Sequence, residues 1–249
     1  MREKIRNIRG IVIRSRPFME NDLCVAVITE LGEKLDLIVK GARGKNSRRK
    51  GHLEVLNLIS ATVYESRHNS YLQTVRCENP FFRLKDSYFS IFSICRLVEI
   101  INARVLEEDP HQEIYDLLLE TMTLLNSETA HLFTVDFALV KLANLLGHLP
   151  SYKNCGSCHR VEDRMYLSEN SNALNCSDCR HANDTPVELK YRKAMEFFRG
   201  AGLSALQKIS LSEEESEFLQ NIIEKLFEKR MKVATTFMNS VVSEPVIHR

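Results

Sequence analysis

Short, mainly apolar runs bounded by polar turn residues fill the first third of the chain. Five runs rich in Val, Ile, Leu, Thr and Tyr, separated by turn residues, cover 8–14, 23–29, 35–40, 55–65 and 71–76. Gly32 predicts a hairpin between the second and third strands, and residues 68–70 predict a turn between the fourth and fifth. Five strands with no long helix among them predict a small closed barrel such as an OB-fold. An SH3-like barrel fits the strand pattern nearly as well.

After Pro80 the apolar spacing changes from two residues to three or four, which predicts amphipathic helices. The first covers 84–107, a second begins after Pro110, and a third covers 129–146. Further helices are predicted at 188–199, 213–226 and 227–242. The predicted fold class is therefore α+β, with a barrel domain over 1–80 and an α-helical domain over 81–249.

Two matched cysteine pairs carry the strongest chemical signal. Cys155 and Cys158, then Cys176 and Cys179, give the spacing C-x2-C-x17-C-x2-C, which lies within the range of four-thiolate zinc sites. Each pair lets two thiolates reach one ion from a tight turn, and the intervening segment can return the second pair to complete a tetrahedron. Because four cysteines leave no open position for water, the pattern predicts one structural Zn²⁺ in a module over about 150–183.

Three other interpretations of this segment are weaker. His159 and His181 lie beside the cysteines and offer imidazole ligands, but both positions are also typical of ordinary polar residues in a metal-binding turn. Two disulfides, or four unrelated thiols, are the remaining alternatives. Disulfides are disfavoured because nothing marks the chain as exported, and unrelated thiols are not expected to occur as two matched pairs.

A basic loop separates the third and fourth predicted strands. It contains no acid and six cations: Lys40, Arg43, Lys45, Arg48, Arg49 and Lys50. Residues 1–80 hold 15 Lys and Arg against 9 Asp and Glu, whereas 81–249 hold 19 against 24. A basic loop on a small barrel suits contacts with nucleic-acid phosphates; a solvated loop without a partner is the alternative. Phe18, Tyr64 and Tyr71 are available for base stacking, although each is also typical of strand interiors.

No pattern in the chain indicates an active site. There is no phosphate-binding GxxxxGK[ST], no GxGxxG and no HExxH. A metal-dependent nuclease needs clustered carboxylates or an open metal position, and the sequence offers neither, so we do not expect an enzyme. No apolar run approaches about 18 residues, and residues 11–13 are too short an apolar stretch for a signal-peptide core. The expected localisation is cytoplasmic.

Two phrases resemble the bacterial DNA repair protein RecO family. In RGIVIRSRPFMENDLCVAVITELGEKLDLIVKGARGKNS, an aromatic and acids precede the second strand, a Thr-to-Gly hairpin follows, and Lys40-Gly41-Ala42-Arg43 with Ser47 matches the family's K-G-A-R-x-x-x-S loop. LLGHLPSYKNCGSC resembles the family's entry into its zinc module. The chain departs from the family in having His159 where glycine is usual and in lacking the glycine pair before Cys176. Some members of that family lack the cysteines altogether.

The resemblance implies an N-terminal OB-fold, an α-helical domain with a zinc module, and a non-enzymatic recombination mediator. Such a protein binds single- and double-stranded DNA, anneals strands, and works with RecR to load RecA onto DNA coated by single-stranded DNA-binding protein (SSB). The resemblance places the acidic, Phe-containing SSB tail on the helical domain, where Arg96, Arg104 and Lys141 are candidate contacts, and implies association with the nucleoid during repair. A zinc-thiolate redox switch and an RNA-binding barrel remain as alternative functions.

Overall fold

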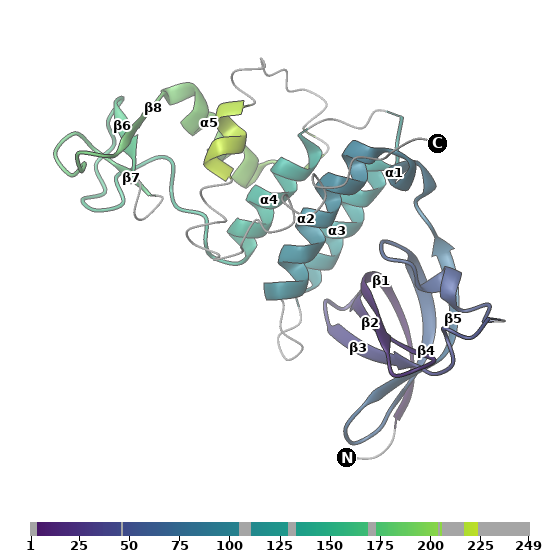
Figure 1. Ribbon diagram of the computed structural model, residues 1–249. Helices are drawn as coiled ribbons and strands as arrows, with labels where there is room; N and C mark the ends of the chain where they lie inside the picture. Colours follow the sequence, from purple (N-terminus) through teal and green to yellow (C-terminus); the bar gives the residue numbers. More distant parts are fainter. Residues whose placement is uncertain are drawn as a thin grey trace. The chain divides into compact units, whose positions relative to one another are not determined.

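The computed structural model describes residues 4–45, 47–104, 111–128, 133–168, 173–203, 205 and 217–223. The chain forms two compact units, 1–130 and 131–249, and each is treated by itself below (Figure 1). None of the helices in these described ranges is long and apolar enough to span a membrane.

Five strands close into a barrel in the first unit. They are β1 (Lys4–Phe18), β2 (Asp22–Thr29), β3 (Lys34–Val39), β4 (Leu58–Glu65) and β5 (Ser70–Asn79). Their order around the barrel is β1-β2-β3-β5-β4, and β3 pairs with β5 in parallel at Leu37 and Ser70. This closure confirms the α+β class and the predicted OB-fold, because strand order together with the parallel pair decides between the two barrel types that strand count alone left open.

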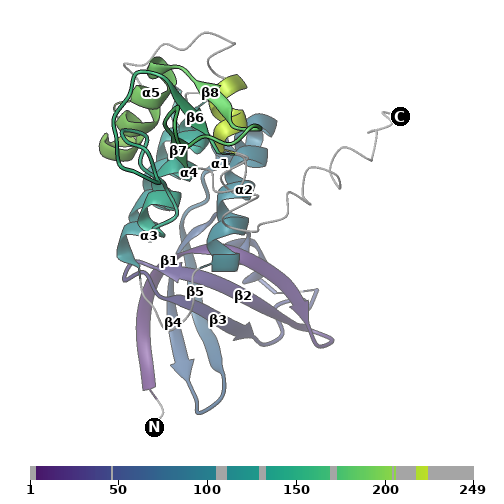
Figure 2. The same ribbon diagram turned by 90° about the vertical axis from the view of Figure 1, so that its left-hand side faces the viewer.

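Strand β1 is long because it pairs with two neighbours. Its first half pairs with β4, from Lys4 opposite Glu65 to Ile11 opposite Leu58, and its second half pairs with β2, from Gly10 opposite Thr29 to Phe18 opposite Asp22. A bulge between Val12 and Arg14 bends the strand. Figure 2 shows the resulting sweep of β1 across the barrel. Side chains from all five strands fill the interior, with Val12, Val25, Leu37, Ile59 and Leu72 among them.

The predicted fourth strand begins three residues too early. Leu56 has a φ of +72° and is buried, a backbone conformation that an extended strand excludes. Asn57 then holds this turn, because its Nδ2 donates to the carbonyl oxygens of Gly51 and His52 at 3.0 and 3.1 Å. The chain therefore reaches β4 only at Leu58.

Three helices pack with the barrel in the first unit: α1 (Phe82–Asp86), α2 (Tyr88–Arg104) and α3 (Gln112–Leu125). The predicted helix over 84–107 is divided at Ser87, whose backbone is extended and whose Oγ accepts a hydrogen bond from the Ser90 amide at 3.2 Å. The β2–β3 hairpin meets the start of α3, where the His111 amide donates to the Gly32 carbonyl at 3.2 Å. The division of the chain at residues 80 and 81 stays a prediction.

The second unit combines helices with a small sheet. Its elements are α4 (Thr134–Leu145), β6 (Met165–Leu167), β7 (Leu174–Asn175), β8 (Thr185–Val187) and α5 (Leu189–Gly200), and residues 217–223 are also helical. Helices α4 and α5 meet where the rings of Phe137 and Phe198 pack edge to face, with centroids 4.8 Å apart. The three-stranded sheet, in the order β7-β6-β8, was not predicted. The predicted helix at 227–242 and half of that at 213–226 lie outside the described residues.

We predict that Gly10→Ala destabilises the barrel by about 1–3 kcal/mol. A Cβ at this position would lie 2.5 Å from the Ile28 carbonyl oxygen and 2.6 Å from Cγ1 of Val27, so the β1 and β2 backbones would have to separate. Chemical denaturation measures the change. Gly51→Ala is the matched control, since a Cβ there meets nothing within 4 Å; equal stabilities of the two variants would contradict the prediction.

Candidate metal centre and nucleic-acid interface

The four cysteines of the two pairs lie together in the second unit. Their sulfur atoms are all within 4.8 Å of one another, and Sγ of Cys158 lies 3.6 Å from Sγ of Cys176. A tetrahedral ion with metal–sulfur bonds of about 2.3 Å places its sulfurs about 3.8 Å apart. The cluster therefore has the donor set and the spacing of a site that could hold one metal ion, and no histidine belongs to it among the described residues.

Two tight turns bring these sulfurs together. In the first turn the His159 amide donates to the Cys155 carbonyl at 3.0 Å, and in the second the Cys179 amide donates to the Cys176 carbonyl at 3.2 Å. The Gly156 amide reaches across to the Leu174 carbonyl at 2.7 Å, and Arg160 forms an ion pair with Asp178 at 2.6 Å. The turns are thus joined to each other by contacts of the protein itself.

Backbone hydrogen bonds prepare Cys155 to act as a thiolate. Burial alone would raise the pKa of this thiol, but hydrogen bonds from the backbone at Cys158, Cys176 and Ser157 outweigh it and lower the pKa to about 6. At Cys179 the opposite holds, because hydrogen bonds with the sulfurs of Cys176 and Cys158 raise the pKa to about 12. Neighbouring thiols share protons in this way when no cation balances their charge.

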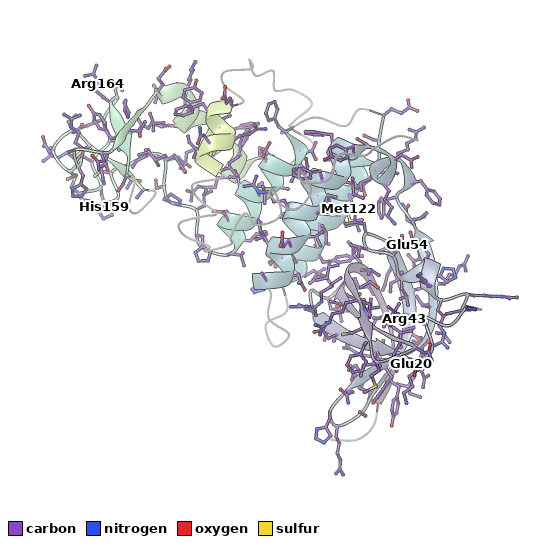
Figure 3. All side chains as sticks on the ribbon, in the orientation of Figure 1. Glu20, Arg43, Glu54, Met122, His159 and Arg164 are labelled. Atoms are coloured by element: carbon purple, nitrogen blue, oxygen red, sulfur yellow. The ribbon has the colours of Figure 1, made fainter. Side chains whose placement is uncertain are left out.

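The two histidines beside the motif have other positions. His159 has a φ of +62°, the left-handed conformation that favours glycine, and its Nδ1 lies 3.4 Å from Nδ2 of Asn154 at the surface. The His181 amide donates to Asp184 at 3.0 Å. The conformation of His159 gives a physical reason why glycine is usual at this point of the sequence pattern. Figure 3 shows His159 at the edge of the module.

A buried arginine of α5 holds the module from the other side. Arg192 is 3% exposed and donates to four backbone carbonyls: Tyr152 at 3.2 Å, Lys153 at 3.1 Å, Glu162 at 2.8 Å and Asp163 at 3.1 Å. Burial lowers the pKa of this guanidinium from its ordinary value. The carbonyls belong to the segments on both sides of the first cysteine pair, so one side chain fixes where the Cys155–Cys158 turn begins and ends.

Two further residues of α5 extend this contact along the helix. Glu196 accepts a hydrogen bond from the Tyr152 amide at 2.7 Å, and Arg199 donates to the Pro150 carbonyl. Positions 192, 196 and 199 are spaced by four and three residues, so they project from one face of the helix. Sequence reasoning missed this role, because a basic residue beside the apolar positions Tyr191 and Met195 has the pattern of an ordinary surface cation.

The basic loop has a fixed beginning and an exposed remainder. Ala42 is fully buried in the barrel core, the Gly41 amide donates to Asp22 at 2.8 Å, and Arg43 donates to the carbonyls of Met19 and Glu20 at 3.3 and 3.1 Å. Figure 3 shows Arg43 close to Glu20 on the barrel. Lys40, Lys45, Arg48 and Lys50 are exposed and Arg49 is half-buried. No ion pair joins any of the six cations to a described acid.

The aromatic candidates divide into two groups. Tyr64 and Tyr71 lie together on β4 and β5, with ring centroids 6.3 Å apart, and Nζ of Lys40 lies 5.1 Å from the centroid of the Tyr71 ring. Phe18 ends β1 and is half-buried. Tyr71 therefore adjoins the basic loop through Lys40, and Tyr64 lies beside Tyr71.

The three candidate contacts for an acidic peptide fall in different units. Arg96 lies on α2 and is half-buried. Lys141 lies on α4 of the second unit, where its Nζ donates to the Arg199 carbonyl at 3.0 Å. Arg104 is the last residue of α2, and its side chain lies outside the described part of the structure. The structure thus gives Lys141 a contact at the end of α5.

We predict that Arg192→Met loosens the cysteine module by about 3 kcal/mol, because it leaves one buried and three part-buried carbonyls without their donor. Limited proteolysis within 150–187 measures the loss. Arg164→Met is the matched control, since Arg164 is exposed on the same module. Identical cleavage rates in the two variants would show that the guanidinium does not hold the module.

Comparisons with known proteins agree with this architecture. The model of the family "Recombination protein O N terminal" matches residues 1–81, and that of "Recombination protein O C terminal" matches 85–233. The chain is 25% identical to the DNA repair protein RecO of Thermodesulfovibrio yellowstonii, over 86% of this chain and 90% of the other. It is 24% identical to that of Desulforamulus reducens over 95% and 94%, and 28% identical to that of Syntrophobacter fumaroxidans over 63% of each chain. The chain belongs to the recombination protein O family of DNA repair proteins.

Proposed function

We propose that the protein is a non-enzymatic recombination mediator that binds single- and double-stranded DNA and anneals complementary strands. With RecR it helps to load RecA onto single-stranded DNA coated by SSB. One observation carries the proposal: a closed OB-type barrel presents a loop of cations that no described acid neutralises. Mobile positive charge of this kind favours phosphates through counterion release and does not depend on base sequence.

The cysteine cluster has a structural role in this proposal. The ion is Zn²⁺, bound by Cys155, Cys158, Cys176 and Cys179. Four thiolates complete its tetrahedral coordination and leave no position for a substrate or an activated water. The ion joins the two turns that the module's own hydrogen bonds already bring together.

The central experiment is strand annealing on coated DNA. We expect the protein to accelerate pairing of two complementary labelled strands, both when they are bare and when SSB covers them. SSB without the terminal Phe of its tail should abolish the second acceleration and leave the first unchanged, because the tail docks an aromatic side chain and acidic residues on the helical domain. Binding to a matched RNA strand at higher affinity than to DNA would support the RNA-binding alternative and count against the proposal.

We predict one tightly bound zinc ion per chain, which Cys176→Ser removes. Structural zinc contributes on the order of 10 kcal/mol of apparent binding free energy in isolated fingers. Because α5 holds the module independently, the expected loss here is local loosening of residues 150–183. Metal analysis of purified protein and hydrogen exchange measure the two effects. Cys77→Ser, on β5 and not a member of the cluster, should retain the metal; purified protein without zinc would refute the assignment.

We predict that Arg48→Glu with Lys50→Glu weakens DNA binding for all sequences alike. Both side chains are exposed, whereas Arg49 is half-buried, so it stays unchanged to protect the fold. For single strands the slope of log affinity against log salt should become less steep by about 1.4, since each phosphate contributes about 0.7.

The matched control reverses two exposed cations of the second unit, Arg164→Glu with Lys193→Glu. It makes the same change in net charge on the other unit. If both double variants lose affinity equally, net charge alone governs binding and the loop is an ordinary solvated segment.

A further inference from the structure

The outer face of the barrel is covered at β2. β2 is buried on both of its faces: Val25 and Val27 point into the core, and Ala26 and Ile28, on the opposite side, are also fully buried. Lys34, which pairs with Ile28 across the β2–β3 ladder, donates to the Asn102 carbonyl of α2 at 2.7 Å. Helices of this unit therefore cover β2, one of the two strands that OB-folds commonly use for oligonucleotides. On the β1–β4–β5 face, α3 reaches Arg9 through the Tyr115 hydroxyl at 3.3 Å, whereas Asn7, Thr74 and Arg76 are exposed.

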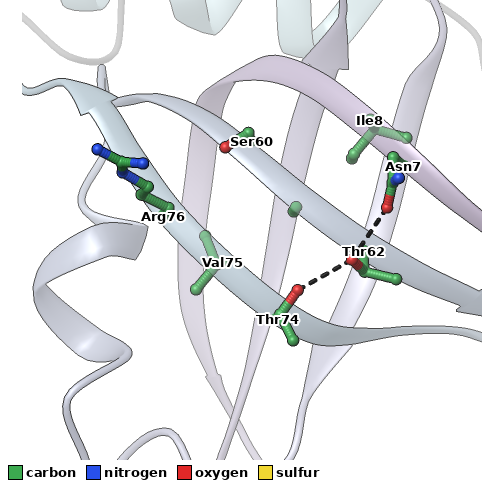
Figure 4. A pocket seen from close by; sticks show the side chains of 8 residues that line it. Asn7, Ile8, Ser60, Thr62, Thr74, Val75 and Arg76 are labelled. Carbon is green, nitrogen blue, oxygen red and sulfur yellow. Dashed lines mark hydrogen bonds between the residues drawn. The ribbon is translucent and has the colours of Figure 1, made fainter.

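A polar groove of about 400 Å³ lies on this β1–β4–β5 face (Figure 4). Strand register places Asn7, Thr62 and Thr74 side by side across β1, β4 and β5. Thr74 Oγ1 donates to Thr62 Oγ1 at 2.9 Å, and Thr62 Oγ1 donates to Asn7 Oδ1 at 3.0 Å. This chain of bonds fixes the amide of Asn7 so that its Nδ2 remains a donor at one end of the groove.

The next row along the strands is basic. Arg9, Ser60 and Arg76 are neighbours across the same three strands, and the small side chain of Ser60 keeps the groove open. Arg9 is bound to Glu78 at 2.8 Å. Arg76 is exposed and forms no ion pair with any acid in the described ranges. The groove therefore offers a guanidinium and an amide, both of which donate, to an acceptor such as a phosphate oxygen.

The row on the other side is aromatic. Ile5, Tyr64 and Tyr71 follow across the strands, because Ile5 pairs with Tyr64 and Tyr64 with Tyr71. The tyrosines lie close enough to act as one platform, and Lys40, the first residue of the basic loop, stands over Tyr71. Basic loop, aromatic row, polar groove and Arg76 are therefore consecutive on one surface.

We infer that this β1–β4–β5 face is a track for single-stranded nucleic acid, with bases stacked on Tyr71 and Tyr64 and the backbone following the groove towards Arg76. Stacking on an aromatic ring needs an exposed base face, which a duplex does not offer. The inference rests on the proposed DNA binding and deepens it: the loop binds phosphates of either form, and the track selects single strands.

The chain contains no tryptophan, so Tyr71→Trp in the full-length protein gives a single fluorescent reporter on the track. We expect an oligothymidylate strand to quench its fluorescence, and an abasic strand of the same length to leave the fluorescence unchanged.

Anisotropy of labelled strands measures binding separately. Tyr71→Ala should lose roughly tenfold or more affinity for oligothymidylate and little for the abasic strand, and Tyr71→Phe should bind normally. Arg48→Glu with Lys50→Glu should lower the affinity for both strands.

A carboxylate placed in the groove tests whether the nucleic-acid backbone follows the groove. Thr62→Glu should weaken binding of both strands. Thr62→Val, which releases Asn7 but adds no charge, should weaken it less. If Tyr71→Trp binds the strand fully but its fluorescence is not quenched, the inference is overturned and the proposed function still stands. The same conclusion follows if a protein partner quenches the fluorescence and the strand does not. If the unaltered protein binds neither strand in anisotropy, both the proposed function and the track fail. Because the quenching experiment uses Tyr71→Trp, it tests base stacking at position 71 even if Tyr71→Ala does not fold.

Discussion

Strand β1 is the element on which the barrel depends, because it pairs with two neighbouring strands, β2 and β4. It pairs with β4 from Lys4 to Ile11 and with β2 from Gly10 to Phe18, so Gly10 and Ile11 appear in both ladders. Only a residue without a side chain lets the β1 backbone approach the carbonyl of Ile28 so closely. Once β1 joins both neighbours, the parallel contact of β3 with β5 completes the circle. The buried interior, the position of the basic loop and the register of the outer rows all follow from this closure.

The arginines show how one side chain type serves different purposes in this molecule. Arg192 donates to backbone carbonyls and holds the cysteine module in place. On the barrel wall, Arg6 and Arg14 are paired with carboxylates at 2.7 to 2.8 Å, which cancels charge where strands must lie close. Arg48 and Arg76 have no such partner among the described residues and remain exposed. The loop and the end of the groove therefore present cations without carboxylate partners, as a surface that meets a polyanion requires.

Local patterns in the sequence predicted those features that local physics determines. Short runs rich in Val, Ile, Leu, Thr and Tyr predicted the strands, and apolar residues spaced by three and four predicted helices such as α3. The spacing of Cys155, Cys158, Cys176 and Cys179 predicted the metal-binding cluster. The misses have a common origin in contacts between distant residues. The start of β4 depends on the left-handed turn at Leu56, which Asn57 and the residues around Gly51 hold. The role of Arg192 depends on carbonyls about 30 to 40 residues away. Likewise, a row such as Asn7, Thr62 and Thr74 exists only once the register is known.

The double pairing of β1 also dictates how the chain must fold. The β1–β2 and β4–β5 hairpins join neighbouring segments, so each can form from local contacts early in synthesis. The β1–β4 ladder joins Lys4 to Glu65 and Ile11 to Leu58, which closes loops of roughly fifty to sixty residues and carries the corresponding loss of chain entropy. Neither hairpin can bury its apolar face until that ladder forms. Barrel assembly is therefore a single late and cooperative event, and until it occurs the edges of β1 and β4 remain exposed to pairing with other chains.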